Sequence, residues 1–413
     1  MTSEQSDTSR DTCFPLTDKT TTIMAIAAGL VVANVYTVRP LLNVIGESLA
    51  MRPANLGLAV TLTQLGYAAG LILLVPLGDL LNRRSLIVGQ TGLSFLALAI
   101  VALSDSPGLF LFALAAVGAL AVTVQTLVAF AGTLALPERR GAVVGKVTGA
   151  IVIGILAARA VSGSVSDVLG WRAVYAISAL VSLVTTLVLS RTLPHDPGHS
   201  GAVNYGSILR SLPRVLVDDR VLRRRAIYAF IIFAAFSTFW TAVVFPLTDA
   251  PFRLSHTQVG LFGLVGIAGA LGARGAGKLV DKGSEHSVTG TALALLCLSW
   301  ALIALLPFSL WWLAAGIVLL DLAVQAVHVT NQTLIVGRHP DAAGRVIAVY
   351  MVFYSLGSAA GAAASTYVYS VSGWHGVCLA GATISIAGLL FWASTARTPT
   401  DNLLTLAVSS CPD

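Results

Sequence analysis

Charged residues are scarce in this chain of 413 residues. Asp, Glu, Lys and Arg together make up 11% of it, less than half of the roughly 25% that soluble globular domains carry. Hydrophobic residues make up 56%. So few charges cannot solvate the exterior of a soluble domain of this size. The composition therefore excludes that class and indicates a protein embedded in lipid.

Cysteine is also scarce, and a cleavable leader is missing. Of the four cysteines, Cys297 and Cys378 lie in apolar runs, and Cys13 and Cys411 lie in the tails. This scatter predicts neither a disulfide framework nor a metal site. Residues 1–20 are polar, without the apolar core and small-residue cleavage site of a signal peptide. We therefore expect the first membrane helix to act as the targeting signal and to stay.

Long apolar runs dominate the sequence. A membrane helix needs about 20 mostly apolar residues, and unbroken runs differ from the alternating segments of about ten residues in a membrane barrel. The runs cover residues 21–45, 55–78, 85–104, 107–134, 143–166, 173–193, 226–248, 257–280, 288–307, 310–336, 346–369 and 375–395. They predict an all-α membrane protein with twelve transmembrane helices.

The placement of positive charge predicts the topology. With the N-terminus in the cytoplasm, nineteen of the 25 Lys and Arg fall on the cytoplasmic side. The other six are Arg52, Arg172 and Arg253 outside, and Arg39, Arg159 and Arg274 within runs. This positive-inside pattern predicts a multi-pass protein of a bacterial cytoplasmic (inner) membrane with both termini in the cytoplasm. Since topology explains the net charge of +6, we expect no nucleic-acid partner.

A polar gap divides the runs into two sets of six. Residues 194–224 are rich in Pro, Gly and Arg, which is typical of a linker, and residues 207–225 predict a short surface helix there. The predicted organisation is a cytoplasmic tail (1–20), a six-helix bundle (21–193), the cytoplasmic linker (194–224), a second six-helix bundle (225–396) and a cytoplasmic tail (397–413).

The two halves resemble each other in sequence. "LPERRGAVVG" (136–145) aligns with "HPDAAGRVIA" (339–348), and "LGWRAVY" (169–175) aligns with "SGWHGVC" (372–378). Both pairs are 203 residues apart, counted between their first residues. A shared shift at separate places predicts two pseudo-symmetric bundles around a central site, an arrangement that recurs among transporters.

The sequence contains one stretch that resembles a cofactor-binding motif, but the match is incomplete. "GARGAGKL" (272–279) fits most of a phosphate-binding loop, but Leu279 stands where Ser or Thr must hold magnesium. The loop also needs a preceding strand, whereas these residues end an apolar run. We therefore expect no nucleotide, metal or other cofactor. Transport would then draw on an ion gradient or run downhill.

Two motifs carry a resemblance to a known family. "VPLGDLLNRRSLI" (75–87) matches the signature loop of the major facilitator superfamily at Asp79, Arg83 and Arg84, and "GKLVDKG" (277–283) is similar to its second-half copy, with Asp281. "GKVTGAIVIGILAARAVSG" (145–163) has the glycine spacing of the antiporter signature. The chain thus resembles the twelve-helix branch of proton-linked drug and metabolite antiporters.

The resemblance implies a conformational latch formed by Asp79, Arg83, Arg84 and Asp281. Asp79 would end the second membrane helix close to the start of the eleventh, near Arg345. A carboxylate at a helix N-terminus is stabilised by about 0.3–1 kcal/mol when exposed and by up to about 2 kcal/mol when partly buried. Such a contact would hold the halves together in one state and break in the other. The alternative for Asp79 is an ordinary interfacial charge.

A polar stripe follows the run 310–336. At about 100° per residue, four side chains fall within an arc of about 60°: Asp321, Gln325, His328 and Gln332. An Asp at a helix centre costs about 2.5–3.5 kcal/mol on insertion scales and rarely faces lipid. We therefore expect the stripe to face a water-filled cavity, with Asp321 as the proton-coupling group and His328 as a relay or substrate contact. The alternative for His328 is a buried packing residue.

Other polar and aromatic residues within runs are candidates for the substrate site. Arg39 and Arg159 could pair with Asp321 or hold an anionic group, although Arg39 could also snorkel to the interface. The remaining candidates, which could equally pack between helices, are Asn34, Tyr36, Gln64, Gln125, Trp240, Gln325, Gln332 and Tyr354.

The leading hypothesis is a monomeric secondary transporter that exports a small organic drug or metabolite in exchange for protons by alternating access. The second is proton-coupled uptake of a sugar or organic anion, which two buried arginines favour. The third is a membrane sensor without flux. We do not expect an enzyme, which is the least favoured class, because the sequence offers no grouping of nucleophile, His and acid. The expected partners are a small-molecule substrate, protons and membrane lipid.

Overall fold

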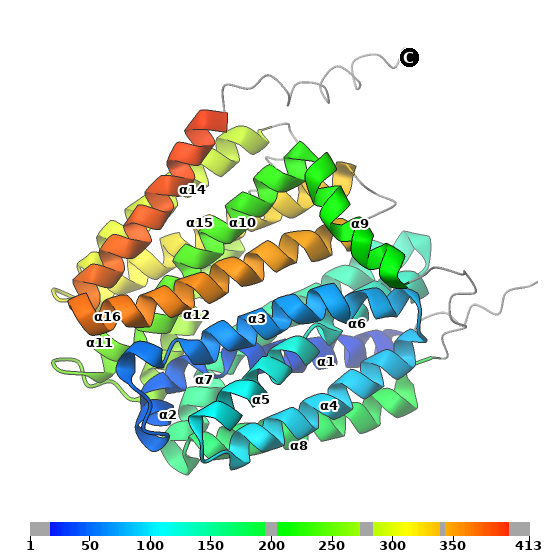
Figure 1. The fold of residues 1–413 in the computed structure, drawn as a ribbon, viewed down its shortest axis with the longest axis horizontal. Helices are drawn as coiled ribbons and strands as arrows, with labels where there is room; N and C mark the ends of the chain where they lie inside the picture. Colours follow the sequence, from blue (N-terminus) through cyan, green and yellow to red (C-terminus); the bar gives the residue numbers. More distant parts are fainter. Residues whose placement is uncertain (1–16, 195–204, 273–283, 339–342, 396–413) are drawn as a thin grey trace, which may run out of the picture.

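The computed structural model describes residues 17–194, 205–272, 284–338 and 343–395. Within these ranges helices form all the regular structure and no strand occurs, which confirms the all-α prediction (Figure 1). The helices of the first part are α1 (Asp18–Tyr36), α2 (Leu42–Ser48), α3 (Leu58–Leu73), α4 (Arg83–Leu103), α5 (Pro107–Leu120), α6 (Thr123–Leu134), α7 (Arg140–Leu169) and α8 (Trp171–Thr192). Those of the second part are α9 (Tyr205–Asp218), α10 (Arg220–Ala242), α11 (Val244–Thr248), α12 (His256–Gly272), α14 (Glu285–Ala304), α15 (Leu310–Arg338) and α16 (Ala343–Thr395). Short 3₁₀ turns are η1 (Arg39–Leu41), η2 (Pro53–Asn55), η3 (Val75–Asp79) and η4 (Pro137–Arg139).

Ten helical segments among the described residues are long and apolar enough to cross a membrane. The predicted run 257–280 begins as α12, which has 17 residues, and continues outside the described ranges. The last two predicted runs both lie within α16. They are separated there by Gly373, where the backbone leaves the helical conformation. The count of twelve spans therefore stays a prediction.

The turn before α8 and the turn inside α16 have the same construction. Gly170 has φ of 82° and ψ of 163°, and Gly373 has φ of 62° and ψ of −158°. This backbone region is essentially confined to glycine and costs a residue with a Cβ roughly 1–3 kcal/mol. Each glycine precedes a buried tryptophan, Trp171 or Trp374. These positions are equivalent in the sequence repeat, so the two copies share a backbone geometry as well as a pattern of residues.

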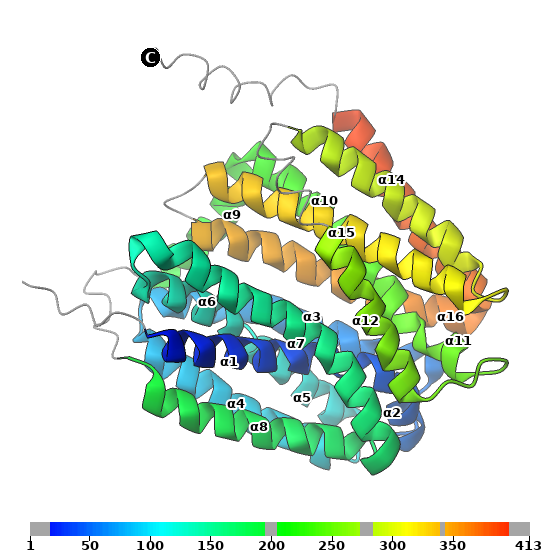
Figure 2. The same cartoon turned by 180° about the vertical axis from the view of Figure 1, so that it is seen from behind.

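The helices before the linker pack mainly on one another, as do those after it (Figures 1 and 2). In the first group α1 packs on α7, α3 on α5 and α4 on α8; in the second α10 packs on α16 and α14 on α15. The two groups meet where α3 packs on α16 and α7 packs on α12. The predicted boundaries of the two bundles stay predictions.

Small residues let these helices approach closely. A Cβ on Gly154 of α7 would overlap the carbonyl oxygen of Gly29 on α1, and a Cβ on Gly163 would overlap the carbonyl oxygen of His256 on α12. Membrane helices associate through such close contacts, since lipid offers no hydrophobic driving force between them. Gly154 and Gly163 of the antiporter-like spacing thus pack α7 on its neighbours, whereas a Cβ on Gly145 would meet no atom within 4 Å.

The linker region contains a helix that differs from the predicted one. A single surface helix was predicted over 207–225, but α9 ends at Asp218 and α10 starts at Arg220. The break occurs because the Asp219 carboxylate caps α10, accepting hydrogen bonds from the backbone N–H groups of Val221 (2.7 Å) and Leu222 (3.2 Å). A side-chain cap of this kind satisfies amide groups that a helix start leaves without partners.

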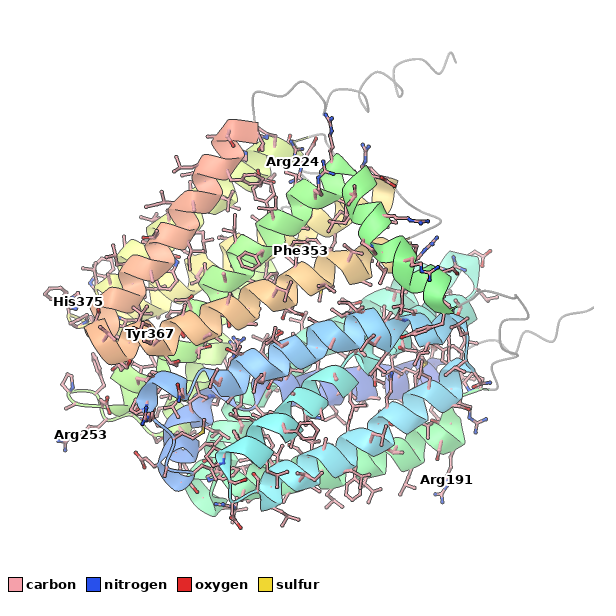
Figure 3. The ribbon with its side chains drawn as sticks, viewed as in Figure 1. Arg191, Arg224, Arg253, Phe353, Tyr367 and His375 are labelled. Atoms are coloured by element: carbon pink, nitrogen blue, oxygen red, sulfur yellow. The ribbon has the colours of Figure 1, made fainter. Side chains whose placement is uncertain are left out.

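The two helix groups are joined by hydrogen bonds at one end of the molecule. We call the end that holds α2 and α11 the distal end, and the end that holds α9 the linker end (Figure 1). Figure 3 shows Arg253 at the distal end and Arg224 at the linker end. At the distal end Asn43 Nδ2 donates to Thr248 Oγ1 at 2.5 Å. The backbone N–H of Gly57 donates to Thr366 Oγ1 at 3.1 Å.

Asp167 makes the most extensive of these distal contacts. Its carboxylate, near the end of α7, accepts from the backbone N–H of His256 (3.2 Å) and of Thr257 (2.8 Å) at the start of α12. It also accepts from the Thr257 hydroxyl at 2.6 Å and lies 2.9 Å from His256 Nδ1. One carboxylate therefore caps a helix of the other group and holds the distal end closed.

Replacing Asp167 with Ala should open the distal end. The change removes charge-assisted hydrogen bonds, each contributing about 1.5–3 kcal/mol, so the population that is open at this end should rise about tenfold or more. Spin labels at Glu47 and Asp249, exposed at the distal end in different groups, would report a longer distance. Asp105→Ala is the control, because Asp105 pairs with Arg172 within the first group at 2.8 Å. Equal distance distributions in both variants would contradict the assignment.

Candidate functional site

Asp321 lies at the interface between the two helix groups. Its side chain projects from α15 and is 6% exposed. Trp240 of α10 donates a hydrogen bond from Nε1 to Asp321 Oδ1 at 3.3 Å. The other carboxylate oxygen lies against Gly266 of α12, where a Cβ would overlap it. The carboxyl is thus held between an indole and a bare stretch of helix.

Two arginines of the first group lie beside this carboxyl. The guanidinium carbon of Arg159, on α7, lies 3.7 Å from the centre of the Trp240 ring, a cation–π contact. The guanidinium carbons of Arg39, in η1, and of Arg159 both lie within 6 Å of the Tyr36 and Phe236 ring centres. Both arginines are buried, at 2% and 3% exposure, so Arg39 does not snorkel to an interface in this conformation.

The arginines are poorly satisfied by the protein. Arg39 Nη2 donates to Ser237 Oγ at 3.4 Å, but Arg39 Nε and Nη1 and Arg159 Nε and Nη2 are buried without a hydrogen-bond partner. Among the described residues, no ion pair of 4.0 Å or less joins Asp321 to either arginine. Buried charged donors without partners are costly, so this arrangement is suited to an anionic group that is not part of the chain.

Aromatic side chains from both helix groups close the site. The hydroxyl groups of Tyr36, on α1, and Tyr354, on α16, form a short hydrogen bond across the interface. Phe233 of α10 packs on Tyr354 with ring centres 4.0 Å apart. Tyr36 and Tyr354 are both buried. The predicted candidates Tyr36, Trp240 and Tyr354 therefore lie together with the three charged residues.

His328 belongs to a separate polar cluster. Its Nδ1 lies 2.9 Å from the hydroxyl of Tyr350, and its ring packs on Phe233 at 5.1 Å. Asn331 Nδ2 donates to the same Tyr350 hydroxyl at 3.4 Å, and Arg225 Nη1 donates to Asn331 Oδ1 at 3.4 Å. These residues come from α10, α15 and α16, so the cluster lies within the second group and extends away from Asp321 towards the linker end.

Among the described residues, none of the predicted amides forms a hydrogen bond with Asp321, whose partner is Trp240. Gln64 of α3 is fully buried, and both polar atoms of its amide are without hydrogen-bond partners. Asn34 lines a groove between α1, α7 and α8, away from the side of α1 that carries Tyr36. Gln325 and Gln332 are partly buried on α15. The role of these four residues in substrate binding stays a prediction.

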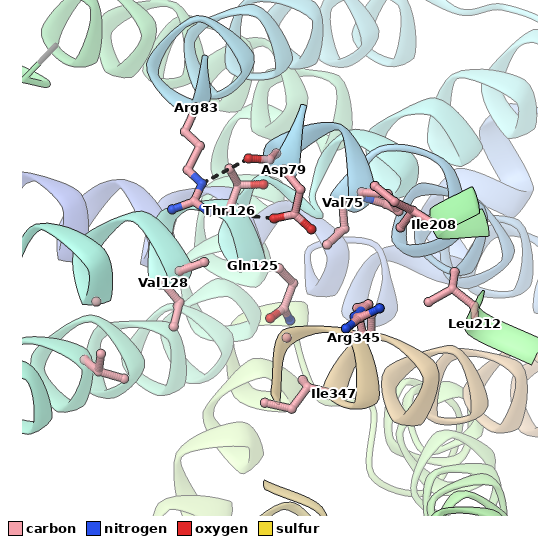
Figure 4. Close-up of a pocket in the computed structure, with 17 residues that line it drawn as sticks. Val75, Asp79, Arg83, Gln125, Thr126, Val128, Ile208, Leu212, Arg345 and Ile347 are labelled. Atoms are coloured by element: carbon pink, nitrogen blue, oxygen red, sulfur yellow. Dashed lines mark hydrogen bonds and ion pairs between the residues drawn. The ribbon is translucent and has the colours of Figure 1, made fainter. Parts of the chain in front are cut away.

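A cavity of about 330 Å³ opens at the linker end between the two helix groups. Its walls come from η3, α6, α7, α9 and the start of α16. Gln125 of α6 lines it and donates a hydrogen bond to the hydroxyl of Tyr67 at 3.2 Å. Figure 4 shows Gln125 beside Arg345, which projects from α16 into the same cavity.

Two of the predicted latch residues, Asp79 and Arg83, line this cavity. Arg83 Nη2 lies 3.7 Å from Asp79 Oδ1, and Arg83 Nε donates to the carbonyl of Gly78 at 3.0 Å (Figure 4). Arg84 donates to the carbonyl of Ser190 at 2.5 Å. Asp281 lies outside the described residues. Asp79 thus pairs within its own helix group, with the cavity between it and Arg345.

The linker helix α9 spans the mouth of the cavity. Its Ile208 and Leu212 line the cavity, and the hydroxyl of Tyr205 donates to the carbonyl of Leu73 on α3 at 2.7 Å. Leu212 also packs in an apolar cluster with Tyr350 of the second group. One helix therefore contacts both groups where they separate.

Comparison with known proteins identifies the family. The family model of the Major Facilitator Superfamily matches residues 24–359 and 226–407. The chain belongs to the Major Facilitator Superfamily. It is 44% identical over 370 residues to YgaY of Escherichia coli strain K12, whose name describes an uncharacterized transporter, covering 90% of this chain and 94% of that one. A Streptomyces coelicolor protein named as a transporter is 31% identical over 379 residues, covering 91% and 87%.

A solved transporter structure has a similar fold. A crystal structure of a variant of the nucleoside transporter NupG superposes with a TM-score of 0.75 at 14% identity, covering 91% of this chain and 99% of that chain. The protein is therefore a multi-pass membrane transporter and not an enzyme. Its bacterial relatives support a location in the inner membrane.

One residue of this superfamily member escaped the sequence analysis. Arg225 is 3% exposed and donates to Thr289 Oγ1 (3.2 Å) and to Asn331, yet it was counted among the cytoplasmic charges. Its position at the end of the run "RRR" (223–225) hid it, because adjacent residues on a helix point in directions about 100° apart. In the triplet 223–225, Arg225 is therefore the member that faces the interior.

Proposed function

We propose that this transporter moves an organic anion together with protons. The observation that carries the proposal is the pair of buried arginines beside Asp321, Arg39 and Arg159, each of which has two guanidinium nitrogens without a hydrogen-bond partner. The substrate would bring an anionic group, such as a carboxylate, to these nitrogens. Guanidinium groups bind such planar anions through paired hydrogen bonds.

The charges of the site determine the sign of coupling. With Asp321 ionised, its carboxylate and the substrate compete for the same two cations. Protonation of Asp321 removes that competition and leaves two positive charges for the anion. By linkage, the proton and the anion then increase each other's affinity by the same factor. This mutual increase favours symport, whereas a cationic drug would be repelled by the arginines.

Alternating access would carry both species across the membrane. The distal end is closed by Asp167 and its neighbours, and the cavity at the linker end leads towards Gln125. If both termini are cytoplasmic, as the positive-inside pattern predicts, this is an inward-facing arrangement. Rocking of the two helix groups would break the distal contacts and bring Asp79 towards the start of α16.

A second candidate is proton-driven export of a drug or metabolite. The glycine spacing of residues 145–163 resembles the antiporter signature, and Gly154 and Gly163 pack α7 tightly on α1 and α12. Export by antiport requires that the proton and the substrate compete for the site. It therefore fits a neutral or cationic substrate that uses the Asp321 carboxylate directly.

The direction of proton movement separates the two candidates. The protein would be reconstituted in liposomes that contain a pH-sensitive dye. Non-permeant anions such as gluconate, glucuronate and aromatic sulfonates, and in separate runs neutral and cationic organic solutes, would be added outside. Symport predicts acidification of the interior after an accepted anion is added. Alkalinisation would overturn the proposal in favour of antiport. Protein-free liposomes control for leakage of weak acids.

A further inference from the structure

Four glycines follow one another at every third position of α12. They are Gly260, Gly263, Gly266 and Gly269. Residues three apart on a helix are neighbours, with about 5–6 Å between their Cβ positions. The helix lies between α7 and α15 and packs on both (Figure 2). The glycines therefore form a strip without side chains between the helices that carry Arg159 and Asp321.

The glycines at the two ends of the strip serve helix packing. A Cβ on Gly260 would overlap the backbone carbonyl of Arg159. A Cβ on Gly269 would come within 2.5 Å of the carbonyl oxygen of Val318 and within 2.7 Å of the backbone nitrogen of Leu322. Contacts between backbones are the usual reason for small residues between membrane helices.

The two central glycines make a different kind of contact. The three atoms nearest to a Cβ on Gly263 all belong to the side chain of Arg159, with Cδ at 3.0 Å. The three nearest to a Cβ on Gly266 all belong to the side chain of Asp321, and the carboxylate oxygen Oδ2 would be overlapped. These glycines therefore make room for the two charged groups and not for a neighbouring backbone.

Trp240 closes the opposite side of the same space. Its ring stacks on the Arg159 guanidinium, and its Nε1 binds Asp321 Oδ1. The cation and the acid thus lie side by side in a slot between an indole and bare helix. The unpartnered nitrogens of Arg159, which is 3% exposed, indicate that this slot receives a ligand group.

We propose that Gly266 is a positioning residue of the transport site, which keeps the Asp321 carboxyl seated against α12 and apart from Arg159. In this seat the acid can exchange a proton without closing an ion pair that would exclude the substrate anion. The inference rests on the proposed function, since it concerns the same acid. A methyl group at position 266 would push the carboxyl out of its seat and towards Trp240 or Arg159.

The test is the infrared band of the protonated carboxyl during a pH titration of the purified transporter. Asp321→Asn assigns the band by its loss. Gly266→Ala should move the titration midpoint by at least about half a pH unit, because the distances from the carboxyl to Arg159 and Arg39 change. Gly149→Ala, where the added Cβ meets no atom within 4 Å, should leave it unmoved.

A second measurement covers the case in which Gly266→Ala is unstable. Its melting temperature should recover when Asp321→Ala removes the colliding carboxyl, because the two positions are directly coupled. A midpoint unchanged by Gly266→Ala, or a melting temperature that does not recover in the double variant, would overturn the positioning role alone. Absence of any band lost in Asp321→Asn would instead count against the proposed function.

Discussion

Replacing Asp321 with Asn should abolish accumulation driven by a proton gradient while exchange of the substrate anion continues. Asn has the size of a protonated Asp and cannot release a proton, so the arginines stay available to the anion in both orientations of the carrier. Loading vesicles with labelled anion and measuring exchange against unlabelled anion separates the two processes. Accumulation should fall to the passive level, whereas exchange should stay within about threefold of the parent rate, since Asn has the shape of the protonated acid and leaves both arginines available to the anion.

Asp105→Asn provides the matched control, because Asp105 is an exposed acid paired with Arg172 at the distal end. This variant should accumulate substrate as the parent does. Normal proton-driven accumulation in Asp321→Asn would refute the coupling role. Loss of exchange as well as accumulation would indicate that the carboxylate itself holds the substrate, as the antiport candidate requires.

Replacing Arg159 with Gln should weaken binding of the anion by about 10- to 100-fold, because a hydrogen bond to a charged group contributes about 1.5–3 kcal/mol. The effect should exceed that on folding, since Arg159 Nε and Nη2 have no partner in the chain to lose. Arg159→Lys should recover only part of the affinity, because an ammonium group lacks the planar fork of the guanidinium. The apparent affinity is measured from the concentration dependence of the dye signal.

Arg52→Gln is the control for loss of a positive charge, since Arg52 is exposed near η2. The proposed anion site predicts a large change for Arg159→Gln and almost none for Arg52→Gln. Equal changes would point to a general effect of net charge. A fall in the melting temperature of Arg159→Gln without any change in affinity would reduce Arg159 to a packing residue on Trp240.

The charged residues of the site could be predicted from the sequence because a charge within a membrane helix has a high free-energy cost. Asp321, Arg159 and Arg39 attracted notice because each is expensive within an apolar run. Their contacts could not be derived, since the hydrogen bond from Trp240 and the seat on Gly266 depend on how α10 and α12 pack against α15. Pattern analysis also cannot foresee that Arg39 lies in a 3₁₀ turn, where the regular advance of 100° per residue no longer holds.

The helical arc of α15 was informative but incomplete. Asp321 and His328 lie within a narrow arc, yet they are two turns apart and have different neighbours, Trp240 for the acid and Tyr350 for the imidazole. Sharing a face on one helix does not guarantee a shared cavity. On α1 the same geometry explains why Asn34 and Tyr36 diverge, because two residues apart on a helix means about 200° of rotation.

The helix α9 has a mechanical consequence. The Tyr205 hydroxyl binds α3 and Leu212 packs on the second group, so we expect these contacts to limit how far the linker end can open. Removing the hydrogen bond of Tyr205 with Leu73, as in Tyr205→Phe, should let the linker end open further without changing any residue of the proposed substrate site. The linker helix would then set how far the two helix groups move apart, in addition to joining them covalently.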